Sequence, residues 1–314
     1  MFWGRSLLFT EGVMVAKKFY YGGQAVVEGV MMRGQKTMVT AVRRPDGSLA
    51  TDIQPLPAFC TGWWRRTPLL RGIIVLIEAM VLGIKALLYS ANVSLEEEGE
   101  KVSGWLLWVM VVAALVLAVI LFFITPLFLT KLLNLQSSVL FNLVDGVIRV
   151  TMFIAYLKVM TLLPDIKRVF AYHGAEHKAV NAYEAGVPLE VAAVKQYDKA
   201  HVRCGTSFLF VVLIISIIVF ALVGLHSTWL MVLSRVILIP VIAALSYEII
   251  YFGARHINHG LVRAVLAPGL WLQALTTSEP DDEQLEVALV ALGKVMEADQ
   301  QEAGEVETAA QPSS

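Results

Sequence analysis

Four long runs of apolar residues divide the chain, and the polar residues gather between them and at the two ends. The runs cover approximately residues 104–130, 138–163, 205–225 and 229–251. A helix that spans a lipid bilayer needs about 20 predominantly apolar residues, and each run meets that length. Short linkers join the first run to the second and the third to the fourth, so the runs pair into two hairpins. The pattern predicts an α-helical integral membrane protein with about four transmembrane helices.

The segment 68–91 is long enough to span as well, but it contains regularly spaced charged residues. Arg71, Glu78 and Lys85 recur every seven residues, which places them in one stripe along a helix. If this segment crossed the membrane, the polar stretch 164–204 would lie outside the cell. The basic residues of that stretch favour the cytoplasmic side instead. We therefore expect an amphipathic helix that lies at the membrane interface or packs into the bundle.

Residues 20–57 alternate shorter apolar runs with turn signals, which is typical of a small β-rich region. The runs QAVVEGVMMRG, TMVTAVRR and SLATDIQPL predict about three strands. Between the last two runs, Pro45-Asp46-Gly47 is a hairpin turn signal. The sequence therefore predicts a small sheet before the first membrane helix.

Composition supports the membrane assignment and orients the chain. Hydrophobic residues make up 57% of the chain and charged residues 16%, against about 25% charged in soluble domains. Lysine and arginine gather before residue 67, in 164–204 and after residue 254, whereas the two short linkers contain only Lys131. Both termini and the polar loop 164–204 are therefore predicted to be cytoplasmic. The net charge of −1 argues against a nucleic-acid partner, and two cysteines are too few for a disulfide framework.

The predicted organisation has five parts. Residues 1–14 form an extension, 15–66 a small cytoplasmic β-rich subdomain, and 67–260 the membrane domain with the loop 164–204. Residues 261–300 contain an interfacial segment anchored by Trp271, then an amphipathic helix that begins near Ser278-Glu279-Pro280-Asp281. The tail 301–314 is predicted to be disordered.

The loop contains the motif with the clearest chemistry, AYHGAEHKAVNAYE at residues 171–184. His173 and His177 are four residues apart, so on a helix they project from one face about 6 Å apart, which suits two ligands of one zinc ion. Glu176 directly precedes His177 in an H-x-x-E-H pattern, where it is a candidate general base. The alternative is the solvated face of an ordinary loop helix.

Four further residues are candidate ligands on the same side of the membrane. Glu184 follows His173 by eleven residues and falls on the same helical face. His201 and Cys204 lie just before the third apolar run, and Glu248 lies inside the fourth, where a carboxylate is costly. The sequence leaves open which of them completes the site.

Asp145 and Arg149 form an i, i+4 pair inside the run 138–163. We expect them to pair with each other or with the polar stripe of 68–91. Such a pair either holds the bundle together or lines a polar path across the membrane.

Four stretches carry a family resemblance: GGQAVVEGVMMRG, HGAEHK, HVRCGTS and PGLWLQALTTSEPDD. With them the chain resembles the YqhQ-like family of uncharacterised bacterial multi-pass membrane proteins, over about residues 20–297. Members are often described as predicted metal-dependent enzymes, and the resemblance implies a place in the bacterial cytoplasmic membrane. The H-x-x-E-H pattern also resembles the inverzincin peptidases, in which a distant downstream glutamate is the third ligand, a position that Glu248 would take.

Three functions follow as hypotheses. The first is a membrane-integral, zinc-dependent hydrolase with His173 and His177 as ligands, Glu184 or Glu248 as the third ligand and Glu176 as the general base. The second is a non-catalytic scaffold or assembly factor whose polar loop docks a protein partner. The third is a transporter that uses Asp145, Arg149 and the polar stripe. The bilayer is the one partner that the sequence identifies, and the substrate and oligomeric state stay open.

Overall fold

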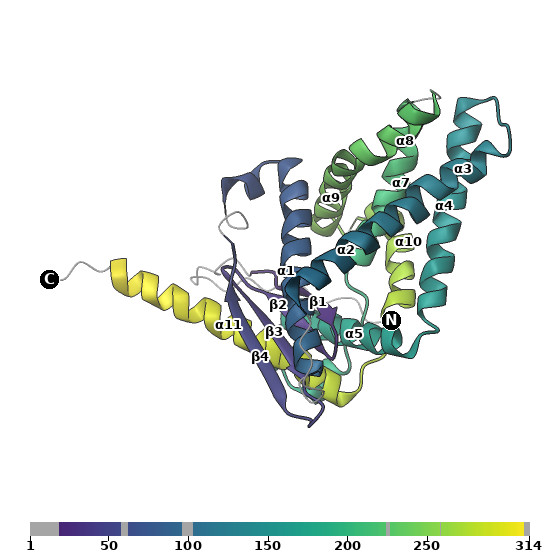
Figure 1. Cartoon of the computed structure of the whole chain (residues 1–314). Helices are drawn as coiled ribbons and strands as arrows, with labels where there is room; N and C mark the ends of the chain where they lie inside the picture. Colours follow the sequence, from purple (N-terminus) through teal and green to yellow (C-terminus); the bar gives the residue numbers. More distant parts are fainter. Residues whose placement is uncertain (1–18, 58–61, 96–102, 224–226, 258, 311–314) are drawn as a thin grey trace.

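The computed structural model describes residues 19–57, 62–95, 103–223, 227–257 and 259–310. Its described part consists of a bundle of apolar helices with a four-stranded sheet and two long polar helices at one end (Figure 1). The sheet and the polar helices share a hydrophobic core of their own, so the molecule has two layers.

The sheet is antiparallel with strand order β1-β2-β3-β4. The strands are β1 (Gly22–Val26), β2 (Gly29–Arg33), β3 (Thr37–Arg43) and β4 (Leu49–Pro55). The prediction of about three strands was wrong, because a two-residue turn splits QAVVEGVMMRG: Val26 pairs with Gly29, and Glu28 adopts a positive φ of 52°. The predicted turn at residues 45–47 is confirmed, with Gly47 at φ 84° between β3 and β4.

The two central strands, β2 and β3, are buried on both faces, which explains why apolar residues predominate in them. Residues that alternate along β2 and β3 serve opposite faces, as the period of two requires. One face packs against α5 (Pro164–Ala185) and α11 (Asp282–Ala310) through Val30, Met32, Val39 and Ala41. The other packs against α1 (Leu70–Ser94) through Met31, Met38, Val42 and Ala50.

Helix α1 joins the two layers. Its first turn lies against α9 (Ile239–Arg255), where a Cβ on Gly72 would come within 2.9 Å of the Ala244 Cα. Its second half packs on the sheet through Leu82, Ala86 and Val93. Helix α1 thus packs against both the bundle and the sheet, and it is also long and apolar enough to cross a membrane, so the prediction that 68–91 does not span stays a prediction.

The polar stripe of α1 is divided between different partners. Arg71 donates from Nε to Glu248 of α9 at 2.8 Å. Glu78 is buried and pairs with Arg33 of β2 at 2.7 Å and with Arg65 of η2 (Trp63–Arg66). The stripe thus ties the helix to the sheet on one side and to the bundle on the other.

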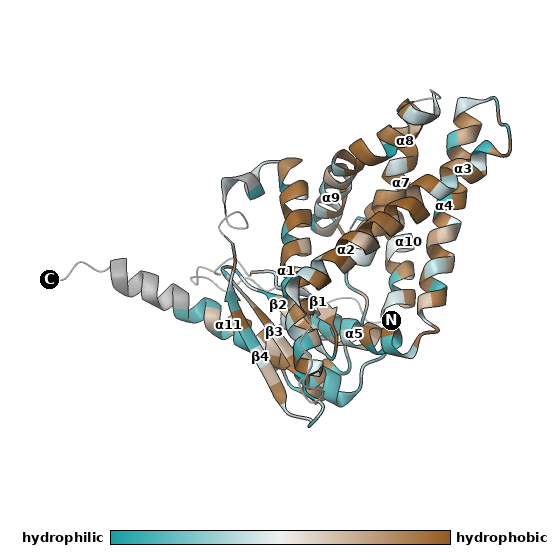
Figure 2. Ribbon diagram, viewed as in Figure 1, coloured by the Kyte–Doolittle hydropathy of each residue, from teal (hydrophilic) through white to brown (hydrophobic). Residues whose placement is uncertain are grey.

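The remaining apolar helices follow the predicted runs closely. Helix α2 (Gly104–Val119) continues through the π-turn η4 (Ile120–Ile124) into α3 (Thr125–Lys131), and α4 (Ser138–Met160) and α7 (Gly205–Val223) are single helices. Each of these three units is long and apolar enough to cross a membrane. Figure 2 shows α2 as hydrophobic around its circumference, in contrast to α11.

The predicted run 229–251 is two helices, α8 (Thr228–Ile237) and α9, which meet at a bend of 44°. Pro240 stands in the first turn of α9, where it removes a backbone donor and obstructs a continuous helix. The pair together has the length of one membrane span.

The predicted pairing of Asp145 with Arg149 is confirmed, with Asp145 Oδ2 and Arg149 Nη2 2.6 Å apart. The alternative pairing with the stripe of α1 is not observed, because Arg71 and Glu78 have the partners given above.

Three helices complete the described part of the chain. Helix α10 (Gly260–Thr276), which we expected at the interface, packs against α7 through Gly269 and Leu272 and leaves Trp271 65% exposed. The short α6 (Val191–Val194) follows α5, which ends at Gly186 in the left-handed conformation. Helix α11 runs to Ala310, across most of the tail for which we predicted disorder. The domain boundaries themselves stay predictions.

A reciprocal capping box begins α11. The Gln284 N–H donates to Asp281 Oδ1 at 2.8 Å, and the Asp281 N–H donates to Gln284 Oε1 at 3.1 Å. These bonds satisfy two backbone donors at the helix start and fix where α11 leaves the segment after α10.

We expect Asp281→Ala to lower the free energy of unfolding by about 1 kcal/mol, the usual contribution of an N-cap side chain. The melting temperature of the purified full chain should then fall by about 2–4 °C. Asp282→Ala is the matched control, because its contact with Lys195 is a solvent-exposed ion pair of small value. Equal shifts for the two variants would contradict the capping role.

Candidate metal centre

Helix α5 presents His173 and His177 on one face, as the spacing predicts. Their rings lie 4.4 Å apart in an edge-to-face arrangement. Gly174 stands between them on the neighbouring face, where an added Cβ would meet the Ser278 carbonyl oxygen at 2.2 Å. A glycine is therefore needed here, because it lets the segment after α10 lie directly against α5.

Cys204 reaches the two histidines from the bundle, at the residue before α7. Its Sγ lies 3.3 Å from His173 Nε2. One ligand atom from each of His173, His177 and Cys204 lies within 4.8 Å of the others, and among the described residues this is the group of His, Cys, Asp and Glu that could hold a metal ion. The structure thus brings together three of the predicted ligands.

Backbone carbonyls hold the Nδ1 atoms of both imidazoles. His173 Nδ1 donates to the Thr276 oxygen at 2.8 Å, and His177 Nδ1 donates to the Lys199 oxygen at 2.6 Å. A carbonyl oxygen only accepts, so each neutral ring carries its proton on Nδ1 and has its lone pair on Nε2. This is the arrangement that orients metal-binding histidines in known sites.

The sulfur of Cys204 lies at the start of a long helix. The Thr206 N–H points to Sγ at 3.4 Å, and the side chain is buried. The sulfur therefore accepts a backbone N–H of the first turn of α7, and a cysteine binds metals through this atom.

Gln273 of α10 fixes the segment that carries Cys204. Its Oε1 accepts from the His201 N–H at 3.0 Å, and its Nε2 donates to the His201 oxygen at 2.8 Å and to Ser207 Oγ at 2.6 Å. Sequence reasoning missed this residue, and the signal was present: it is a buried amide in an otherwise apolar stretch.

His201 and Glu184 lie beside the cluster rather than in it. The His201 ring is 5.7 Å from the His177 ring, and its Nε2 is 3.6 Å from Glu184 Oε1. Glu184 also pairs with Arg203. Burial raises the pKa of Glu184, but its hydrogen bond with His201 and the charge of Arg203 outweigh burial, so the pKa is lowered.

The other two predicted residues have partners elsewhere. Glu176 is buried and accepts from the Gly23 N–H of β1 at 2.9 Å through Oε1. Glu248 is paired with Arg71 and accepts from the Leu69 N–H at 2.9 Å. Their roles as general base and third ligand stay predictions.

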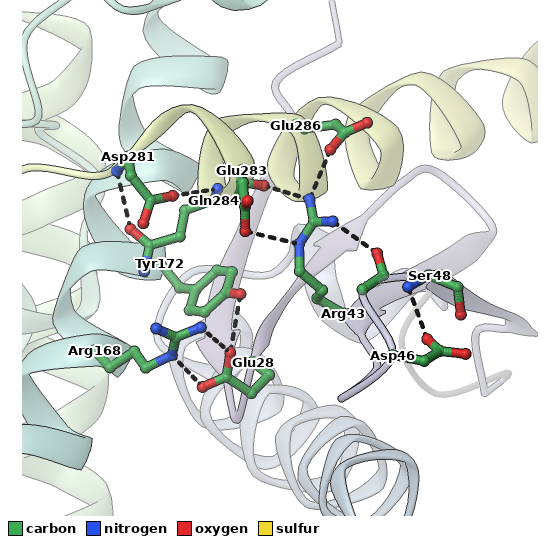
Figure 3. Close-up of polar contacts among 11 residues, drawn as sticks. Glu28, Arg43, Asp46, Ser48, Arg168, Tyr172, Asp281, Glu283, Gln284 and Glu286 are labelled. Carbon is green, nitrogen blue, oxygen red and sulfur yellow. Dashed lines mark hydrogen bonds and ion pairs between the residues drawn. The ribbon is translucent and has the colours of Figure 1, made fainter.

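A polar network anchors α5 to the sheet at Arg168 and Tyr172, the residue that precedes His173 in the chain (Figure 3). Arg168 binds both oxygens of Glu28 in the β1–β2 turn, with Nη2 and Oε2 2.7 Å apart, and the Tyr172 hydroxyl donates to the same carboxylate at 3.3 Å. Burial, and then the charge of Glu28, raise the pKa of Tyr172, so the phenol stays protonated. The network holds the helix that carries both histidines in one register on the sheet.

The donor set has a definite chemical preference. Two imidazole nitrogens and one sulfur favour borderline and soft ions over magnesium or calcium, which prefer oxygen ligands. The cluster could hold a metal ion, and its geometry alone does not identify which ion.

Comparison with known proteins places the chain in a family. Residues 67–298 match the model of a family described as a protein of unknown function, DUF1385. The chain is also 36% identical over 298 residues to "Uncharacterized protein YqhQ" of Bacillus subtilis (strain 168), which covers 88% of this chain and 92% of that protein. No solved structure matches the chain. The resemblance carried by the four sequence stretches is thereby confirmed: the chain is YqhQ-like and belongs to the DUF1385 family.

Proposed function

We propose that the chain is a membrane-integral, zinc-dependent hydrolase whose metal ligands are His173, His177 and Cys204. The observation that supports it best is the pair of carbonyl contacts that leave both Nε2 lone pairs free beside Cys204 Sγ. Three protein ligands are typical of catalytic zinc sites, in which the fourth position is left for water or substrate. A zinc ion held by these three residues would act as a Lewis acid and would lower the pKa of a bound water.

The third ligand in this proposal is a thiolate, not one of the glutamates that we weighed first. Glu184 and Glu248 each have arginine partners, and moving either carboxylate to the cluster would leave a guanidinium unpaired. Cys204 needs no such rearrangement, because its sulfur already lies 3.3 Å from His173.

We assign proton transfer to His201. Its ring is next to that of His177, and Glu184 faces its Nε2, so the carboxylate orients the imidazole. Glu176 could act as the base only after giving up its bond to Gly23, which would loosen α5 on the sheet.

A second candidate function rests on the same atoms without a metal. The sulfur of Cys204, the ring of His173 and the Thr276 carbonyl form a chain of contacts of 3.3 and 2.8 Å. A thiol, a base and a group that orients the base are the parts of a cysteine nucleophile. Metal content and thiol reactivity distinguish this candidate from the zinc enzyme.

We expect the full chain purified from membranes to contain about one zinc ion per chain, as a site with three ordered ligands requires. Cys204→Ser should remove most of this zinc, and cobalt bound to the unsubstituted protein should show thiolate charge-transfer absorption that the variant lacks. The measurement is elemental analysis together with the cobalt spectrum. Cys60→Ser is the control, since it removes the chain's other thiol, which lies outside the described residues. A metal-free protein in which Cys204 is alkylated rapidly would instead favour the nucleophile.

Gly174→Ala tests the site without removing any ligand. The new Cβ would press on the Ser278 carbonyl and displace the segment that holds the Thr276 oxygen on His173. We expect zinc affinity to fall by about 10–100-fold, the usual effect of disturbing the groups behind metal ligands. Competition with a chelator measures the change. Gly205→Ala, next to Cys204 with open space at its Cβ, should leave the affinity unchanged; equal losses for both variants would refute the argument.

We further infer how the chain is threaded through the membrane. The sheet and α5 share one core, so they lie on the same side, and an even number of the three apolar units between them must cross. Because α1 packs along the sheet from Leu82 to Val93, the crossing units are α2–α3 and α4. Helix α11 shares that core too, so α7 and the pair α8–α9 are the other two crossings. The lysine and arginine distribution supports the cytoplasmic side for this core.

Single cysteines introduced into the Cys60→Ser background should report this threading. We expect Gln136→Cys and Ser227→Cys, in the two short linkers, to react with an impermeant maleimide on intact cells. Gln196→Cys in the polar loop and Lys85→Cys on the exposed side of α1 should react only after the membrane is permeabilised. Reaction of Gln196→Cys on intact cells would overturn the assignment, and the background without an added cysteine is the blank.

A further inference from the structure

A charged cluster lies inside the helical bundle, away from the metal centre. It consists of Asp145 and Arg149 on α4 and Arg235 on α8, which are 2%, 0% and 2% exposed. Both arginines donate to the same oxygen, Asp145 Oδ2, at 2.6 Å from Arg149 and 3.3 Å from Arg235. Arg149 also donates to Ser216 Oγ of α7 at 2.6 Å.

The cluster carries one positive charge too many. Two guanidinium groups face one carboxylate, and guanidinium stays protonated in proteins. Asp145 is the only acidic residue in the segments 104–163 and 205–247, so these segments provide no second carboxylate. An uncompensated charge is strongly unfavourable in a buried apolar setting.

Neighbouring groups offset the excess positive charge of the cluster only in part. The Phe220 ring centroid lies 4.1 Å from Arg235 Cζ and 5.1 Å from Arg149 Cζ, and Arg235 stands in the last turn of α8, near its negative end. Even so, Arg149 Nε, Arg235 Nε and Asp145 Oδ1 have no hydrogen-bond partner within the described part of the chain. The two guanidinium Nε–H donors therefore lack an acceptor, and the cluster keeps a net charge of +1.

We propose that a small monovalent anion of the halide class binds at Arg149 and Arg235, beside Ser216. Burial decides the class of ligand, because side chains that are 0–2% exposed are closed to a carboxylate of another protein or to a lipid headgroup. One negative charge neutralises the cluster and accepts from the orphaned guanidinium nitrogens. The proposal uses none of the metal-centre residues and is independent of the proposed zinc chemistry.

The test uses the purified full chain and chloride itself. Replacing gluconate by chloride should raise the melting temperature by at least about 2 °C in a saturable manner, because a ligand of the folded state stabilises it. Tryptophan fluorescence reports the transition, and broadening of the chloride NMR line reports binding directly. Equal melting temperatures in the two salts, or chloride binding that Arg235→Gln leaves intact, would overturn the proposal.

Two substitutions remove the need for the anion by different routes. Arg235→Gln leaves Asp145 and Arg149 as a neutral pair, and Ser216→Asp supplies the missing carboxylate beside Arg149. Each should abolish the chloride-dependent shift, so failure of one variant to fold leaves the other as the test. Arg255→Gln, an exposed arginine at the far end of α9, should keep the full shift, and its loss there would mean that chloride acts elsewhere.

Discussion

The packing of α5 against the sheet positions everything else in the molecule. Small residues on one side of this helix, among them Ala175, Ala179 and Ala182, are fully buried in the core that it shares with β2, β3 and α11. At 100° per residue, His173 and His177 point to the opposite side, away from the sheet. A close helix–sheet contact, which alanine permits, therefore orients the two imidazoles toward the bundle. Bonds from Glu176 to β1 and from Arg168 to Glu28 fix the rotation and the register of the helix.

The candidate metal centre lies where the two layers meet. The sheet layer supplies His173 and His177, and the bundle supplies Cys204 at the start of α7 and Thr276 at the end of α10. Most of these groups are buried, so their positions are set by packing and by backbone contacts rather than by solvent. Gln273 illustrates the point: one side chain binds both backbone groups of His201 and so determines the path of the chain toward Cys204. A site built in this way needs both cores to be folded before it forms.

Much of this could be predicted from the sequence, for reasons that lie in periodicity and composition. Apolar length identified the helices, and the i, i+4 spacing correctly placed His173 and His177 on one helical face. The choice between Cys204 and Glu248 could not be made, because it depends on a long-range contact: Arg71, on a different helix, draws Glu248 away. The fourth strand was missed because a positive φ at a glutamate leaves no signature in the pattern. Arg235 was missed because it lies 90 residues from Asp145 in the chain.

The two layers are joined at two separate places. This affects how the properties of a variant that lacks the metal ligands should be interpreted. On α1, Glu78 pairs with Arg33 of the sheet while Arg71 pairs with Glu248 of the bundle, so one rigid helix is bonded to both layers. The cluster of His173, His177 and Cys204 is the second connection. Two connections fix the relative orientation of two bodies, where one connection would leave a hinge. Since α1 also buries apolar surface against both layers, its connection persists when the metal ligands are replaced. A ligand variant that remains folded but inactive would therefore report the chemistry of the centre and not a collapse of the architecture.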